Sequence, residues 1–170
     1  MARVIISRLL ALLFVGCTTT TPEIQQVTAT DYKIKGKLHK FEYDQIISIV
    51  KCNPNVRINF YVTSPGGTSE DLLEAMDAVY RHGDVHWYVV DDCSSACAVL
   101  ALSTHHASGE VRLHSFYQHK RHKVIPAPEY NEQIIDHLKQ YGYDTTKLNY
   151  MFNTVEEMWP VKVEDGVIVK

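Results

Sequence analysis

Hydrophobic and polar residues alternate along two early segments of the chain, and this pattern predicts strands over Tyr32–Phe41 and 56–62. Between them, Tyr43–Val50 carries apolar residues on one side at helical spacing and predicts a short helix. A second helix is expected to begin near Glu70, after a pair of glycines, and to end at Gly83. Strands and helices that alternate in this way are typical of an α/β protein with mostly parallel strands.

The same alternation continues through the second half of the chain. Val85–Val90 predicts a buried strand, Ser95–Leu102 a helix that is apolar on nearly every side, and Val111–His114 a third short strand. Pro128 is placed to begin a further helix, since proline fits the first helical position. The residues from Val161 to Val169 predict a terminal β-hairpin.

The first 17 residues predict an export leader. Arg3 and Arg8 give it a positive start, and Leu9–Val15 is an apolar run too short to span a bilayer. The sequence LFVGC, which ends at Cys17, resembles a bacterial lipobox. This resemblance implies cleavage before Cys17 and lipidation of its thiol, whereas the alternative is a plain leader with an incidental cysteine.

The remaining residues predict a tether followed by one domain. Residues 18–30 are rich in threonine and predict a flexible tether, and 31–170 is enough chain for a single domain. The residue after Cys17 is threonine, which in a Gram-negative lipoprotein favours the outer membrane and a periplasmic location. A net charge of −3 provides no basic field for nucleic acid.

The histidines and cysteines are the candidates for metal sites and disulfides. Nine histidines are scattered without an H-E-x-x-H motif, so the sequence predicts no dedicated metal site and no cofactor. Apart from Cys17, the chain has Cys52, Cys93 and Cys97. In an oxidising compartment Cys93 can pair with Cys97, or Cys52 with one of these two. The third alternative is that these cysteines are small buried residues that pack a tight helix start.

Two segments supply groups that acyl transfer needs. Gly66 and Gly67 follow a strand and precede a helix, where they can turn sharply and leave N–H groups unpaired for an oxyanion; the alternative is an ordinary turn. Ser95 is expected at the first position of the apolar helix, capped by Ser94, and gains there from the helix dipole. The N–H of Ala96 can join the same oxyanion hole.

A base is also required, because a serine hydroxyl is a weak nucleophile. His114 ends a strand expected beside the strand before Ser95, and parallel neighbours place their carboxyl ends on one side. The alternative is a structural histidine. His105 and His106 are expected in a loop, and Cys93 or Cys97 as nucleophile lacks a neighbouring basic residue.

The segments YVTSPGG (61–67), CSSACA (93–98) and RLH (112–114) resemble the Clp protease proteolytic subunit and its crotonase-like superfamily. They are closer to exported Clp-protease-like proteins of bacteria, whose serine lies in a C-x-S-A-C context. The likeness covers about residues 56–118. It implies a ClpP/crotonase-like ββα spiral with mostly parallel strands.

By this resemblance, Ser95 would be the nucleophile and His114 the base. An N–H of Gly66 or Gly67, together with that of Ala96, would form the oxyanion hole.

The family's catalytic aspartate has no clear counterpart. The matching region, about 153–157, contains Glu156 and Glu157 but no aspartate, and Asp144 lies nearer the start of the predicted helix. A triad without its orienting carboxylate loses much of its rate.

These observations favour an envelope-located, ATP-independent serine peptidase or hydrolase that acts on peptide or protein substrates and is tethered to the membrane by a lipid anchor. The alternative is a catalytically inactive Clp-protease-like lipoprotein whose groove binds peptide or an envelope protein. A crotonase-type acyl-CoA enzyme is a more distant reading, since CoA is not expected outside the cytoplasm. The sequence leaves open whether the chain forms a homo-oligomer.

Overall fold

The computed structural model describes residues 24–120, 123–152, 159–164 and 167–169. Their main feature is a seven-stranded sheet with the spatial order β1-β2-β3-β4-β5-β8-β9. The sheet strands are β1 (Ile24–Gln26), β2 (Asp31–Lys35), β3 (Ile58–Ser64), β4 (Val85–Cys93), β5 (His106–Leu113), β8 (Trp159–Glu164) and β9 (Val167–Val169). Strands β2 to β5 pair in parallel, and β1, β8 and β9 join antiparallel at the edges.

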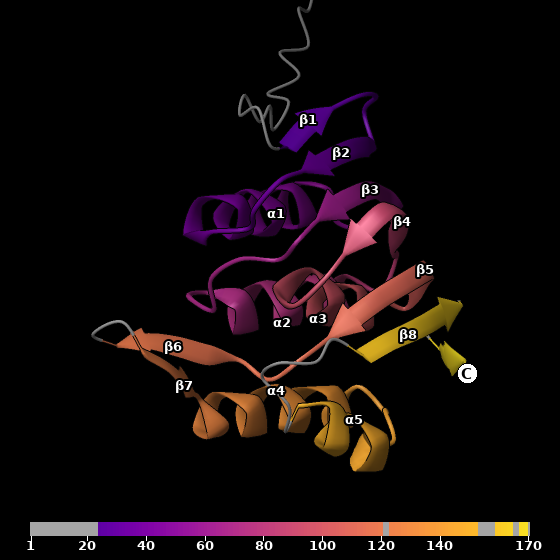
Figure 1. Ribbon diagram of the computed structural model, residues 1–170. Coiled ribbons are helices and arrows are strands. Elements are labelled where there is room, and N and C mark those ends of the chain that lie inside the picture. Colours follow the sequence, from indigo (N-terminus) through magenta and orange to yellow (C-terminus); the bar gives the residue numbers. More distant parts are fainter. Residues whose placement is uncertain (1–23, 121–122, 153–158, 165–166, 170) are drawn as a thin grey trace, which may run out of the picture.

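The described helices are α1 (Lys40–Cys52), α2 (Leu72–His82), α3 (Ala96–Leu102), α4 (Pro128–Gln140) and α5 (Thr145–Met151). Helices α1, α2 and α3 lie along one side of the sheet, whereas α4 and α5 lie together beyond β5 (Figure 1). A separate hairpin of β6 (Tyr117–Lys120) and β7 (Lys123–Pro126) projects from the body between the level of α2 and that of α4 (Figure 1). None of the described helices is both long and apolar enough to cross a membrane.

The core lies between the sheet and its helices. Residues alternate between buried and more exposed along β3, as expected for a strand covered on one face. Tyr32, Phe60 and Trp87 are adjacent in the register of β2, β3 and β4, and their ring centroids lie 5.6 and 5.3 Å apart. All three are buried, so this aromatic row fixes the register of the strands that lead to Ser95.

The structure confirms the predicted α/β class with a mostly parallel sheet, and several boundaries differ from those expected. The strand predicted to reach Phe41 ends at Lys35, because Gly36 has a φ of 107° and α1 begins at Lys40. The expected tether is wrong from residue 24 onward, since β1 pairs with β2 and Ile24 is fully buried. Strand β5 begins at His106, within the expected loop.

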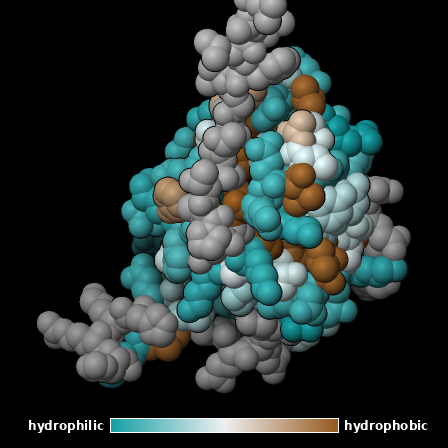
Figure 2. Space-filling model, turned by 90° about the horizontal axis from the view of Figure 1, so that it is seen from above, coloured by the Kyte–Doolittle hydropathy of each residue, from teal (hydrophilic) through white to brown (hydrophobic). Residues whose placement is uncertain are grey.

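Seen from above the β1 end, the surface is mainly hydrophilic, and hydrophobic side chains show in small areas among hydrophilic ones (Figure 2). On the part of this face that is coloured, no broad apolar surface of the kind that marks an interface is visible.

Candidate active site

Ser95 lies in the tight connection between β4 and α3. Ser94 forms an isolated parallel bridge with Arg112, and the Ser95 N–H donates to the Arg112 carbonyl at 2.8 Å. Ser95 itself is the N-cap of α3, so the helix begins at Ala96, one residue later than expected, and the Ser95 hydroxyl makes no capping hydrogen bond. Its φ of 56° and ψ of −122° are sparsely populated for a residue with a side chain, and such strain is concentrated at functional sites.

The neighbouring serine has a different role from the expected cap. The Ser94 hydroxyl donates to Asp92 Oδ1 at 2.6 Å, and the Ser94 N–H donates to the Ser64 carbonyl at 3.0 Å. Ser94 is therefore held by its neighbours, whereas Ser95 lines a cavity.

Ser95 and His114 line the same cavity, which has a volume of about 270 Å³. Strand β5 ends at Leu113, so the parallel pairing with β4 brings His114 to the edge where Ser95 lies. The cavity is lined by Gly67, Thr68, Ser69, Ser95, His114, Phe116 and Tyr117. Both candidate catalytic residues are buried, at 8% and 6% exposed, and both line this one pocket.

The ring of His114 is oriented by a backbone carbonyl. Its Nδ1 lies 2.7 Å from the carbonyl oxygen of Ser115. A carbonyl can only accept, so Nδ1 must carry the proton, and Nε2 is left with the lone pair that a general base needs. The Ser115 carbonyl therefore performs the orienting part of the role that a carboxylate has in a catalytic triad.

The candidate carboxylates are placed elsewhere or lie outside the described residues. Asp144 is exposed, and its Oδ1 accepts the Thr146 N–H at 3.0 Å as a cap of α5. This bond lowers the pKa of Asp144, with a further contribution from the Thr146 side chain. Glu156 and Glu157 lie outside the described residues.

The sequence did not single out Asn131, which holds the segment after His114. This amide is buried; its Nδ2 donates to Ser115 Oγ at 2.7 Å and to the Phe152 carbonyl at 3.3 Å, and its Oδ1 accepts the Phe116 N–H at 2.8 Å. Asn131 thereby fixes the residue whose carbonyl orients the imidazole.

We expect Asn131→Ala to reduce the reactivity of Ser95 about fivefold and to lower the free energy of unfolding by about 2–4 kcal/mol, because it leaves buried groups of Ser115 and Phe116 without partners. The measurement is the rate of labelling by a serine-directed probe beside urea denaturation. The matched control is Ile134→Ala on the same helix, which costs about 2–5 kcal/mol by leaving a cavity but keeps these bonds. Equal loss of labelling in both variants would contradict the positioning role.

Of the two glycines, Gly67 is the one with a free donor. The Gly66 N–H donates to Ser64 Oγ at 3.1 Å, whereas the N–H groups of Gly67 and Ala96 have no hydrogen-bond acceptor among the described residues. A Cβ added to Gly66 would lie 2.9 Å from the Ala96 nitrogen, so the glycine turn approaches the start of α3 closely. These two N–H groups are the candidate oxyanion donors.

Two tyrosines, the buried Tyr43 and the half-buried Tyr130, hold the cavity wall from different helices. Tyr43 of α1 donates to the Thr68 carbonyl at 2.7 Å, and Tyr130 of α4 donates to the Ser69 carbonyl at 2.6 Å. Burial raises the pKa of both phenols well above the ordinary value, so they remain protonated donors at physiological pH. The wall beside Ser95 is therefore fixed by neutral hydrogen bonds.

A disulfide joins Cys93 to Cys97 and encloses Ser95. Cys52 is therefore bonded to neither of them, and this corrects the alternative pairing that the sequence left open. Since both thiols are oxidised, neither cysteine is available as the nucleophile.

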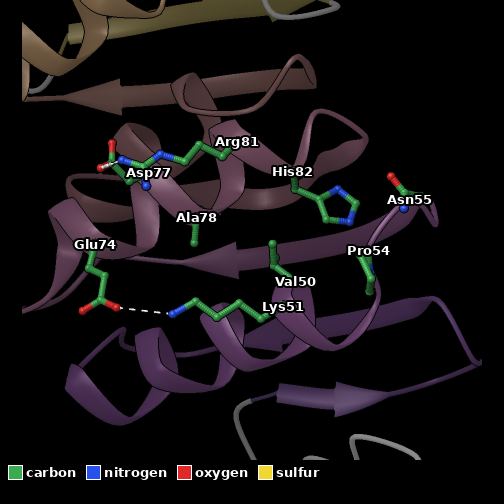
Figure 3. A pocket seen from close by; sticks show the side chains of 9 residues that line it. All are labelled: Val50, Lys51, Pro54, Asn55, Glu74, Asp77, Ala78, Arg81 and His82. Carbon is green, nitrogen blue, oxygen red and sulfur yellow. Dashed lines mark hydrogen bonds and ion pairs between the residues drawn. The ribbon is translucent and has the colours of Figure 1, made fainter.

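A second cavity, of about 390 Å³, lies between α1 and α2. Its charged side chains pair with one another: Lys51 Nζ lies 3.6 Å from Glu74 Oε1, and Arg81 Nη2 lies 2.8 Å from Asp77 Oδ2 (Figure 3). None of the described residues that line it is a serine, threonine or cysteine. It is larger than the Ser95 cavity but lacks a nucleophile.

Comparison with known proteins supports the fold. No protein-family model and no curated protein matches the chain. The ClpP protease catalytic domain from Plasmodium falciparum is similar with a TM-score of 0.56 and 15% sequence identity, over 75% of each chain. The chain thus has a ClpP-like α/β fold, as the sequence predicted.

Two mutants of the 1510-N membrane-bound stomatin-specific protease are also similar. A serine-to-alanine mutant has a TM-score of 0.48 and 21% identity, over 65% of this chain and 61% of that one. A lysine-to-alanine mutant in complex with a substrate peptide has a TM-score of 0.49 and 20% identity, over 65% and 57%. The chain therefore spans about three-fifths of the length of these proteins.

Proposed function

We propose that this chain is a serine hydrolase that cleaves peptides or small acyl substrates, with Ser95 as nucleophile and His114 as general base. The observation that carries the proposal is that strained Ser95 and His114, whose Nδ1 is held by the Ser115 carbonyl, line one cavity. Gly67 lines the same cavity and Ala96 follows Ser95, and the N–H groups of both have no acceptor among the described residues. The ClpP-like fold adds support.

The proposed reaction follows from these groups. Ser95 Oγ attacks the substrate carbonyl while its proton passes to His114 Nε2, and the resulting oxyanion accepts hydrogen bonds from Gly67 and Ala96. His114 then returns the proton to the leaving group, and water hydrolyses the acyl-enzyme by the same steps. A carbonyl stabilises the imidazolium less than a carboxylate does, so we expect a slow enzyme.

The test is labelling of the purified full chain with a fluorophosphonate probe, with the modified peptide identified by mass spectrometry. We expect a label on Ser95, loss of labelling in Ser95→Ala and His114→Ala, and nearly unchanged labelling in Ser94→Ala, whose hydroxyl is bonded to Asp92. A folded parent that does not label would overturn the hydrolase proposal and favour a groove that binds peptide or an envelope protein.

The location is a separate proposal that rests on the sequence of the leader. We infer that Cys17 is lipidated and tethers the domain to the bacterial envelope, on the periplasmic side of the outer membrane. Incorporation of labelled palmitate that persists in Cys17→Ser would contradict this anchor.

A further inference from the structure

A cluster of metal-binding side chains lies at the other end of the sheet from Ser95. It consists of Asp84, just before β4, and of His86 and His106 near the starts of β4 and β5. Ser95 and His114 follow the carboxyl ends of the same strands. At about 3.3 Å per residue, the eight residues of β5 separate the two ends by roughly 23 Å. The cluster is therefore independent of the proposed hydrolase site.

The parallel register brings the two imidazoles together. His86 and His106 are direct partners in the pairing of β4 with β5, and their rings stack with centroids 4.2 Å apart. Asp84 precedes His86 by two residues, which is the spacing that places side chains on the same face of a strand. One ligand atom from each of the three residues lies within 4.8 Å of the other two.

The pair His86 and Asp84 already has the spacing of ligands around one ion. His86 Nε2 lies 3.1 Å from Asp84 Oδ1. Two ligand atoms each about 2.0–2.1 Å from a tetrahedral zinc ion lie roughly 3.3 Å apart, so little movement is needed. A side-chain rotation of about 1–2 Å would close the remaining gap to His106.

The other ring nitrogen of His86 is held as metal-ligating histidines usually are. His86 Nδ1 lies 3.2 Å from the hydroxyl of Tyr88, and only 12% of the His86 side chain is exposed. The Asp84 carboxylate can only accept, so in the metal-free protein Nε2–H donates to it and Nδ1 accepts from the Tyr88 hydroxyl. A cation at Nε2 would replace that proton, and the hydroxyl, which can rotate, would then accept from Nδ1–H. The tyrosine thus holds the orientation of the ring, and its hydroxyl can serve either tautomer.

We propose that Asp84, His86 and His106 bind one divalent cation of the zinc class. Two imidazoles and one carboxylate suit zinc, cobalt, nickel or copper better than magnesium or calcium, which prefer oxygen ligands. Three protein ligands leave the fourth position of a tetrahedral ion to water or to another small ligand. No sequence motif marks this site, because its ligands come from two neighbouring strands and the residue before one of them, and not from one helical motif.

The positive charge of Arg57 lies beside the proposed cation site and should weaken metal binding, which provides a test. Its Nε lies 3.2 Å from the same Asp84 oxygen that faces His86, and its side chain is 61% exposed. The guanidinium supplies the positive charge beside this carboxylate, and it must turn away into solvent when a cation binds. Removing this charge should therefore strengthen metal binding, whereas at an unrelated site it should have no effect.

The experiment is titration of the chelator-treated full chain with cobalt(II), followed by its visible absorption, and then displacement by zinc(II). We expect one equivalent with tetrahedral-type bands, at least tenfold weaker binding in His106→Ala and Asp84→Asn, and several-fold tighter binding in Arg57→Gln. The matched control is His105→Ala, whose ring stacks on Tyr80 outside the cluster and which should bind like the parent.

Equal loss of binding in His105→Ala and His106→Ala would overturn the site and indicate non-specific binding to histidines. An unchanged affinity in Arg57→Gln, which keeps all three ligands, would also overturn it. Circular dichroism of each variant shows that the fold is kept. The readout is the bound ion, so the result does not depend on hydrolase activity.

Discussion

Replacing Gly66 with alanine should reduce labelling of Ser95 about 100-fold or more. Gly66 has a φ of 87°, and an added Cβ would lie 2.5 Å from the Ser94 carbonyl oxygen and 2.7 Å from Ser95 Cβ. Backbone and Cβ atoms cannot move aside as a flexible side-chain end can. The turn must therefore shift away from α3 and carry the neighbouring Gly67 N–H out of place, and loss of one oxyanion donor costs about 100–1000-fold.

Stability measurements separate this close approach from backbone strain. We expect Gly66→Ala to cost about 2–5 kcal/mol, since overpacking adds to the roughly 1–2 kcal/mol of a left-handed alanine. Gly83→Ala is the matched control, because Gly83 has a φ of 80° and open space where a Cβ would lie. Gly83→Ala should lower the free energy of unfolding only by the roughly 1–2 kcal/mol of the left-handed backbone conformation, and Ser95 should label at the full rate. Similar stability losses in the two variants would contradict the close packing of Gly66 against the serine turn.

Much of the frame could be predicted because it depends on local patterns. The alternation that predicted a strand over 56–62 matches β3 within two residues, and Gly83 ends α2 as expected. Pro128 begins α4 at the predicted position. Hydrophobic periodicity and helix termini are set by neighbouring residues, and these can be identified without knowledge of the fold.

The orientation of His114 could not be predicted in the same way. A backbone carbonyl has no sequence signature, and only the path of the chain after β5 directs that of Ser115 at the imidazole. Asn131 did leave a signal: it precedes Ile134, Ile135 and Leu138 at helical spacing, so it is a polar residue on the buried stripe of α4. A buried amide in such a position usually has a hydrogen-bonding role.

The pair of stacked histidines illustrates the same limit. His86 and His106 are twenty positions apart, and they meet only because β4 and β5 pair in parallel in one register. The sequence predicted that the strand begins at Val111, which placed His106 in a loop. The pairing of His106 with His86 could therefore not be predicted. An error of a few residues in one strand therefore concealed a cluster that lies far from the serine.

Reduction of the Cys93–Cys97 disulfide should slow labelling of Ser95 about tenfold. The bond closes a ring of only five residues around Ser95, whose φ of 56° and ψ of −122° are costly. Such a conformation costs about 1–3 kcal/mol, and persists only where its surroundings hold it. If the open loop relaxes, the relaxed conformation is favoured over the reactive one by that free energy. Each 1.4 kcal/mol lowers the population of the reactive conformation about tenfold, and the labelling rate falls with it.

The measurement is the labelling rate with and without dithiothreitol, in the parent and in a Cys93→Ala, Cys97→Ala double variant. We expect the reductant to slow the parent and to leave the already slow variant unchanged, which excludes effects of reduction elsewhere, at Cys52 for example. The double variant should also lose about 2 kcal/mol of stability, the small entropic contribution of a short ring. A variant that labels as fast as the oxidised parent would show that the hydrogen bond from Ser95 to Arg112 and the turn at Gly66 hold the serine without the disulfide.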